Sequence, residues 1–256
     1  MSNAELSADS LGLSSEDLGP RLWKSALAEG IALLLFVFIS AGSVIVALDA
    51  TQGELTVAAV TAISLAHGLA IGALVAMTAK LSGGHVNPAV TFAAVITQRM
   101  KVAPGVVYVA AQLTGAVLGA LLLQVVLVDA VEGDLGSYGG PSSLLDGVGA
   151  AVVVEATLTF VLVFVVFSTA MDPKRGLGHV APLFIGLAIL IGHLVGVPLT
   201  GPAMNPALAF GPALVSGNWP GDGLDWVAIY VAGPLIGAAL AGVVYMVAFW
   251  DREEDA

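Results

Sequence analysis

Residues 82–92, SGGHVNPAVTF, and residues 200–210, TGPAMNPALAF, decide the fold of this chain. Both stretches contain the tripeptide Asn-Pro-Ala, as Asn87, Pro88, Ala89 and as Asn205, Pro206, Ala207. The surrounding chain is very apolar, with 58% hydrophobic residues, 11% charged residues and a mean hydropathy of +0.97. An ordinary soluble domain has about 25% charged residues. The composition therefore indicates an integral membrane protein, in which a repeated polar tripeptide needs an explanation.

Six apolar stretches are long enough to cross a bilayer, which takes about 20 helical residues. They are residues 25–48, 58–79, 104–128, 148–171, 180–199 and 226–249. With six spans, both termini lie on one side, and all eight basic residues fall on that side: Arg21, Lys24, Lys80, Arg99, Lys101, Lys174, Arg175 and Arg252. The opposite loops carry only acidic charges. The positive-inside rule then predicts a multi-pass protein of the cell membrane with both termini in the cytoplasm.

An internal repeat divides the chain into two halves. A shift of 118 residues aligns 68–92 with 186–210 without a gap, and 10 of the 25 positions are identical. Three spans in each half force the second half to insert upside down, which predicts an inverted-topology repeat. We expect a first channel repeat at 21–130 and a second at 148–250. The remaining segments are a disordered cytoplasmic tail at 1–20, an extracellular connecting loop at 131–147 and a cytoplasmic tail at 251–256.

Each Asn-Pro-Ala tripeptide opens an apolar segment, 88–98 or 206–215, that is too short to span the membrane. Asn is a preferred N-cap and Pro suits the first helical position, so each segment is predicted to be a half-helix. Inverted symmetry brings the two half-helices in from opposite faces. Their N-termini, each carrying about half a positive charge, would meet near the midplane and repel protons and cations.

The residues 82–91, SGGHVNPAVT, and 200–213, TGPAMNPALAFGPA, resemble the two signature loops of the aquaporin (major intrinsic protein) family. The resemblance covers about 23–250. It implies an all-α membrane protein with six transmembrane helices, two re-entrant half-helices, a pore in each protomer and a homotetramer. It also implies that Asn87 and Asn205 donate hydrogen bonds to a single-file solute.

The family resemblance assigns two further groups of residues. Backbone carbonyls of the re-entrant segments would form a ladder of acceptors, at Gly83, Gly84, His85, Gly201 and Ala203. Glu29 and Glu155 match buried acids that hold the two loops through backbone N–H groups. A carboxylate inside a membrane should in any case face the interior and have a partner, although solvation at a helix end is the alternative.

Family members narrow again toward the outer mouth, at four positions fixed by their distance from the two Asn residues. Here those positions are His67, His193, Pro202 and Leu208. His193 matches water-selective members, in which this His narrows the pore and donates a hydrogen bond. His67 resembles the tonoplast channels of plants, and Leu208 removes the usual filter Arg, as in some of those channels. Pro202 is unusual for the family.

These features favour a passive channel for water and other small neutral solutes, with ammonia first and hydrogen peroxide and urea next. A glycerol or broader solute facilitator is the alternative, and an ion-coupled secondary transporter ranks lower. We expect no enzymatic activity, no metal and no cofactor, because the sequence shows no metal cluster and no nucleophile–base spacing. The chain has no Cys, and its net charge of −11 argues against a nucleic-acid partner. That charge suits a high-salt habitat or simply an acidic surface.

The sequence leaves open whether the channel is gated, by pH at His67, His193 or His179 or by other means. The charged run at 172–176, DPKRG, is expected to be solvated.

Overall fold

The computed structural model describes residues 11, 17–127, 135, 139–221 and 223–251, and these residues form helices and loops without a strand. Six helical spans are long and apolar enough to cross a membrane. They are α2 (Pro20–Ala50), α3 (Val57–Thr78), α5 (Val102–Val126), α7 (Gly147–Val166) with η1 (Phe167–Met171), η2 (Gly178–Val180) with α8 (Ala181–Gly196), and α10 (Leu224–Val227) with η3 (Ala228–Ala232) and α11 (Gly233–Ala248). The six predicted spans are therefore confirmed.

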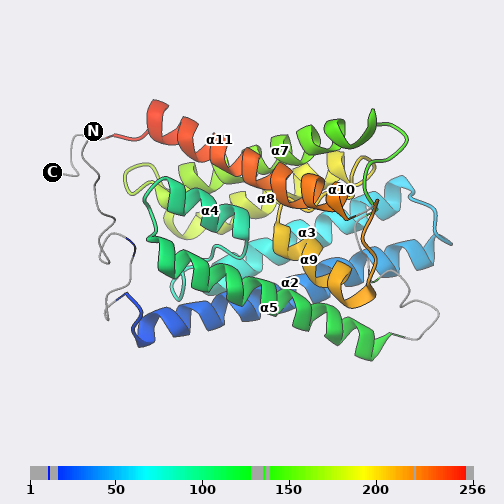
Figure 1. Cartoon of the computed structure of the whole chain (residues 1–256), viewed down its shortest axis with the longest axis horizontal. Coiled ribbons are helices and arrows are strands. Elements are labelled where there is room, and N and C mark those ends of the chain that lie inside the picture. The colour runs from blue at the N-terminus through cyan, green and yellow to red at the C-terminus, as the bar shows by residue number, and fades with distance from the viewer. Residues whose placement is uncertain (1–10, 12–16, 128–134, 136–138, 222, 252–256) are drawn as a thin grey trace.

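Two shorter helices, α4 (Pro88–Ile96) and α9 (Pro206–Ser216), occupy the places predicted for half-helices. Figure 1 shows α4 in the half of the molecule where α2 begins and α11 ends, and α9 in the other half. We call the end where α2 begins and α11 ends the inner end, and the opposite end the outer end. Most of the predicted tails and part of the predicted connecting loop lie outside the described residues.

The spans pack as the inverted repeat requires. α2 packs on α5 in the first half, α7 packs on α11 in the second, and α3 packs on α8 across the two halves. Two glycines permit the close crossings: a Cβ on Gly115 would collide with the Gly30 carbonyl, and a Cβ on Gly237 would collide with the Ala156 carbonyl. Small residues at such crossings are typical where helices associate within lipid.

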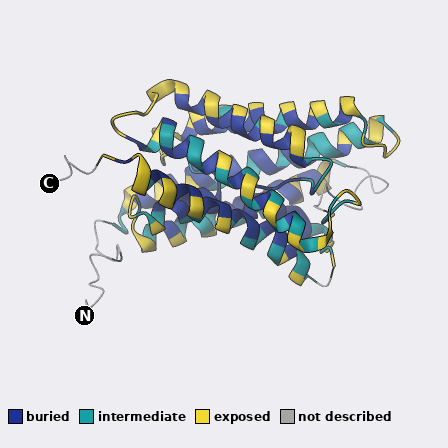
Figure 2. Ribbon diagram, turned by 90° about the horizontal axis from the view of Figure 1, so that it is seen from above, coloured by how far each residue is buried: buried dark blue, intermediate teal, exposed yellow. Residues whose placement is uncertain are grey.

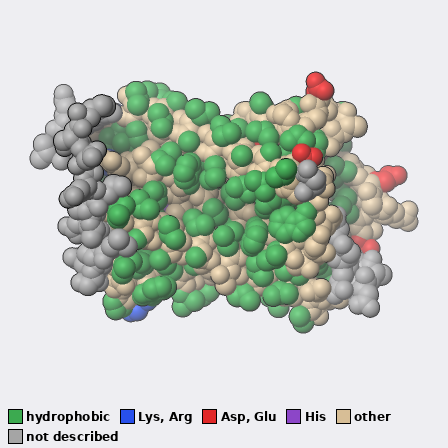
Figure 3. All heavy atoms as spheres, in the orientation of Figure 1, with side chains coloured by type: hydrophobic (Ala, Val, Ile, Leu, Met, Phe, Trp, Pro, Cys, Tyr) green, Lys and Arg blue, Asp and Glu red, His purple; other side chains and the backbone are tan. Residues whose placement is uncertain are grey.

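Hydrophobic side chains cover the outside of the bundle as well as its core. Buried residues face inward between the helices and exposed residues face outward (Figure 2). In the face shown in Figure 3, hydrophobic side chains spread over the whole middle of the molecule, and the charged side chains lie at its ends. Exposed leucines and valines such as Leu27, Val57 and Val125 would be costly in water and are favourable against lipid.

Candidate functional site

The two Asn side chains join the half-helices at the centre of the molecule. Asn87 and Asn205 are the N-caps of α4 and α9, with extended backbone, and each is followed by Pro at the first helical position. The Asn87 Oδ1 accepts from the Ala89 N–H at 2.8 Å, and the Asn205 Oδ1 accepts from the Ala207 N–H at 3.1 Å. Asn is needed here because its side chain can both cap a helix and donate through its NH₂ group.

Each Asn also donates to the opposite loop. The Asn87 Nδ2 donates to the Met204 carbonyl at 2.8 Å, and the Asn205 Nδ2 donates to the Val86 carbonyl at 2.9 Å. An amide NH₂ has two hydrogens, so each Asn keeps one for another acceptor. The exchange brings the N-termini of α4 and α9 together, and with them the two partial positive charges.

Two buried carboxylates support the loops that precede the Asn residues. Glu29 accepts from the backbone N–H groups of His85 at 3.0 Å and Val86 at 2.6 Å. Glu155 accepts from those of Ala203 at 3.2 Å and Met204 at 3.0 Å. Both side chains are fully buried, and charge-assisted hydrogen bonds of this kind are the strong ones. The acids are not solvated at helix ends.

The backbone held by these acids is strained. Val86 has a φ of 48° and Met204 a φ of 49°, in the left-handed region that non-glycine residues rarely adopt. Strain of this kind persists only where the surroundings impose it, and it is concentrated at functional sites. Here the two carboxylates and the two Asn amides impose it from both sides.

Two tyrosines that were not predicted as site residues complete the support of the loops. The Tyr108 hydroxyl donates to the Ser82 carbonyl at 2.8 Å, and the Tyr230 hydroxyl donates to the Thr200 carbonyl at 2.6 Å. The offset of 122 residues between the tyrosines equals the offset between Gly115 and Gly237, so the repeat itself carried the signal. Gln112, which donates to Glu29 at 2.8 Å, has no such counterpart and gave no signal.

An outer cavity of about 380 Å³ leads toward the site from the outer end, and its lining includes His67, His193, Gly201 and Pro202. The two imidazole rings lie 4.1 Å apart between centroids. Leu208 is fully buried and is outside the set of residues that line this cavity. The structure thus brings three of the four predicted filter residues to one cavity.

The hydrogen bonds of the two His rings fix which ring nitrogen carries a hydrogen. The Nδ1 atoms lie 2.8 Å and 2.9 Å from the carbonyls of Ile63 and Ile189, respectively. A carbonyl can only accept, so each Nδ1 carries a hydrogen and a neutral ring offers its Nε2 as an acceptor. The Nε2 of His193 is buried without a protein partner among the described residues. The N–H of a neutral His193 is used by the helix backbone, so the donation that the family resemblance implies would need a doubly protonated ring.

An inner cavity of about 320 Å³ lies on the other side of the Asn pair. Its lining includes Gly83, Gly84 and His85, three of the residues predicted for the carbonyl ladder. Of the other two, Gly201 lines the outer cavity and Ala203 is buried. Among the described residues, no group of three or more His, Asp or Glu side chains is arranged to hold a metal ion.

The two cavities lie at opposite ends of the molecule, and the two capped half-helices meet between them. This is the arrangement of a membrane channel with six spans and two half-helices. The chain belongs to the major intrinsic protein family, whose model matches residues 18–245. It is 42% identical over 241 residues to a probable TIP-type aquaporin of Medicago truncatula, covering 93% of this chain and 92% of the relative. It is 41% identical over 227 residues to aquaporin-4 of Homo sapiens, covering 89% of this chain and 68% of the relative.

A solved structure supports the fold independently. The crystal structure of an aquaglyceroporin from Plasmodium falciparum matches with a TM-score of 0.75 at 21% identity, over 88% of this chain and 95% of that one. At this level of identity the match concerns the fold alone.

Proposed function

We propose that this protein is a passive channel for water, with the pore running from the outer cavity past Asn205 and Asn87 to the inner cavity. The observation that carries the proposal is that the two Asn residues that cap the half-helices each donate to the opposite loop, which leaves one amide hydrogen of each Asn for a passing solute. The relatives named as aquaporins support the same function. Opposed helix N-termini at the midplane would exclude protons and cations.

The outer filter is proposed to favour small neutral solutes that donate hydrogen bonds. Its two neutral rings offer acceptors, and neither Pro202 nor Leu208 has a side-chain donor. Water and ammonia can donate to both rings without needing a donor from the wall. Hydrogen peroxide also has two donors, whereas urea must leave its carbonyl unpaired at the constriction. We therefore rank ammonia first among the additional solutes, then hydrogen peroxide, then urea.

A glycerol or broader solute facilitator is the second candidate, because Leu208 removes the bulky filter Arg. An ion-coupled transporter is less well supported. Its inverted repeat and half-helices would be the same, but it would need a site for the coupling ion. Glu29 and Glu155, the acids buried inside the described spans, already accept hydrogen bonds from the loops.

We also propose a homotetramer in the cell membrane with cytoplasmic termini. The described basic residues, from Arg21 to Arg175, lie in segments at the inner end, and the positive-inside rule supports a cytoplasmic location for this end. Some relatives are named as TIP-type channels, so an internal membrane is the alternative location.

The solute profile in proteoliposomes tests the proposal. Stopped-flow light scattering should show fast flux of water and, with a pH-sensitive dye inside, of ammonia, in proportion to the protein added. Urea and glycerol should permeate more slowly than either. Glycerol flux as fast as that of water would favour the facilitator, and flux that needs a sodium or proton gradient would favour the transporter.

A further inference from the structure

The inner cavity is bordered by an aromatic residue that follows the last helix. α11 ends at Ala248, and the backbone N–H of Trp250 donates to the Tyr245 carbonyl at 3.0 Å. The chain thereby turns back toward the bundle. Trp250 lines the inner cavity and is only 9% exposed, so its indole is packed into the protein at the mouth of the proposed pore.

Three separate segments meet at this rim. The Arg99 guanidinium lies 4.3 Å from the ring centroid of Trp250, within the range of a cation–π interaction. Both residues line the inner cavity together with Pro173. Arg99 follows the half-helix α4, Pro173 follows η1 and Trp250 follows α11.

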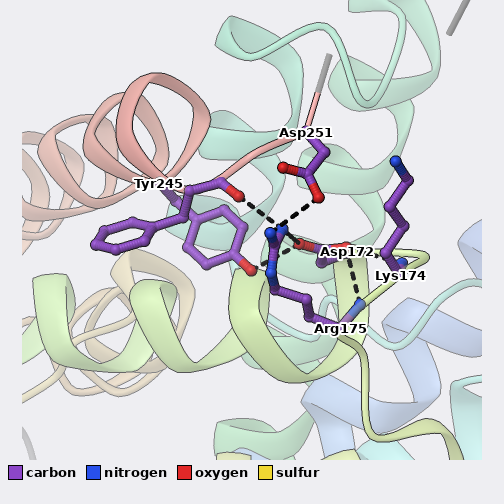
Figure 4. Close-up of polar contacts among 6 residues, drawn as sticks. Asp172, Lys174, Arg175, Tyr245 and Asp251 are labelled. Atoms are coloured by element: carbon purple, nitrogen blue, oxygen red, sulfur yellow. Dashed lines mark hydrogen bonds and ion pairs between the residues drawn. The ribbon is translucent and has the colours of Figure 1, made fainter. Parts of the chain in front are cut away.

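Arg175 fastens the chain on both sides of Trp250. One guanidinium nitrogen donates to the Phe249 carbonyl at 2.7 Å, and the other donates to the Asp251 carboxylate at 2.9 Å (Figure 4). A planar guanidinium can hold two acceptors at once in a fixed geometry, which a Lys cannot do. We call Arg175, Asp172, Phe249 and Asp251 the inner clasp.

Asp172 holds the Arg175 end of the clasp. Its Oδ1 accepts from the backbone N–H groups of Lys174 at 2.8 Å and Arg175 at 3.0 Å. Its Oδ2 accepts from the Tyr245 hydroxyl at 2.8 Å, and the Arg175 side chain lies 3.4 Å away. Asp172 is 3% exposed, so the expectation that this charged run is simply solvated is wrong for this residue. Its carboxylate accepts hydrogen bonds from four donors, three in its own turn and one in α11.

We propose that Trp250 is a permeation-determining residue of the inner mouth and that Arg175 is the residue that positions it. With the clasp closed, the indole narrows the entrance to the inner cavity and restricts solutes larger than water. With the clasp broken, the segment at 249–251 loses its attachment and the entrance widens. This inference rests on the proposed pore. It can be tested separately, because the entry of a thiol reagent into the inner cavity can be measured without any transport of water or solute.

The chain has no Cys, so one introduced thiol reports on access to the cavity. Ala94 is buried and lines the inner cavity. In an Ala94→Cys background, the modification rate with a charged methanethiosulfonate reagent should rise several-fold when Trp250→Ala is added. Trp250→Phe, which keeps a ring, should stay close to the background rate. Equal rates in all three proteins would overturn the proposal.

The positioning role of Arg175 has its own readout. Arg175→Gln should speed modification of the thiol about as much as Trp250→Ala does, and it should add nothing in the Trp250→Ala background, because both changes act through one residue. Arg175→Lys should give an intermediate rate. If Arg175→Gln lowers the thermal stability in detergent, Asp251→Asn, which weakens one arm of the clasp, provides the comparison. Additive effects of Arg175→Gln (or Asp251→Asn) and Trp250→Ala would overturn the assignment.

Discussion

The side-chain amide of Asn87 donates to the backbone carbonyl of Met204 across the centre of the molecule, at 2.8 Å. These residues are 117 positions apart in the chain. The relationship ties the cap of one half-helix to the strained residue that precedes the other, and Asn205 makes the equivalent bond to Val86. Because the contact is reciprocal, it holds the N-termini of the two half-helices against each other. The proposed barrier to ions depends on this shared arrangement.

Replacing Asn205 with Asp tests the barrier. The Asp side chain still accepts from the Ala207 N–H and so keeps the cap, but it loses the donor to the Val86 carbonyl and adds a negative charge at the midplane. We expect Asn205→Asp to admit monovalent cations, measured as current in planar bilayers. Asn205→Ser, which caps without the charge, is the matched control and should stay silent. Absence of current from Asn205→Asp would contradict the proposed electrostatic barrier.

Restoring a basic residue at position 208 tests the filter. Leu208 is fully buried, and Arg is longer and carries several donors. We expect Leu208→Arg to reduce the flux of ammonia and urea while leaving most of the water flux, because the constriction becomes narrower and positively charged. Leu208→Met changes the shape without adding a charge and should retain the native solute profile. An unchanged profile in Leu208→Arg would show that residue 208 does not face the constriction.

Removing a loop-supporting acid should destabilise the fold. Glu29→Leu leaves the N–H groups of His85 and Val86 and the Ser82 hydroxyl without their buried acceptor, at a cost of about 1–3 kcal/mol for each unsatisfied group. We expect a large drop in the thermal unfolding temperature in detergent. Exposed Leu27→Ala, on the same helix, is the control and should unfold near the native temperature. Similar unfolding temperatures for Glu29→Leu and the control would refute the role of the acid.

Acid should release the inner clasp through Asp172. Burial raises the pKa of this carboxyl. Hydrogen bonds from Tyr245 and from the backbone and side chain of the following turn lower the pKa by more than burial raises it, so the net pKa is below its usual range. A depressed pKa stabilises the folded state above the unfolded value of about 3.9, and this contribution is lost as the pH falls through the folded value. Thermal stability should therefore decrease in that acidic window. Asp172→Asn should lower the stability at neutral pH and show a weaker decrease there; an equal decrease in both proteins would assign the effect to other groups.

Much of this fold was predictable because its signals occur twice. The six spans follow from apolar length, and the half-helices follow from Asn87 and Asn205 in register with the repeat. Tyr108 and Tyr230 could also have been predicted as a pair, because the offset between them equals the offset between Gly115 and Gly237. The remaining features involve contacts without a repeat partner. Gln112 has no counterpart, and nothing in the local sequence indicates that Trp250 turns back to the inner cavity.

The hydrogen-bond direction at the filter could not be predicted either. Whether a His donates or accepts depends on what its other nitrogen contacts, and the relevant carbonyls of Ile63 and Ile189 become partners only once the helix and the ring orientation are known. The charged run near Asp172 is a similar case. A solvated loop and a buried cap have the same residue types, and part of the cap comes from Tyr245, which lies far along the chain.

The osmotic water permeability of proteoliposomes, measured by stopped-flow light scattering without any ion gradient, decides whether this protein is a water channel. We expect a permeability that rises linearly with the amount of protein, does not saturate with the osmotic gradient and is accompanied by no proton or sodium current. Water permeability no higher than that of empty liposomes, from protein that is folded and inserted, would contradict it.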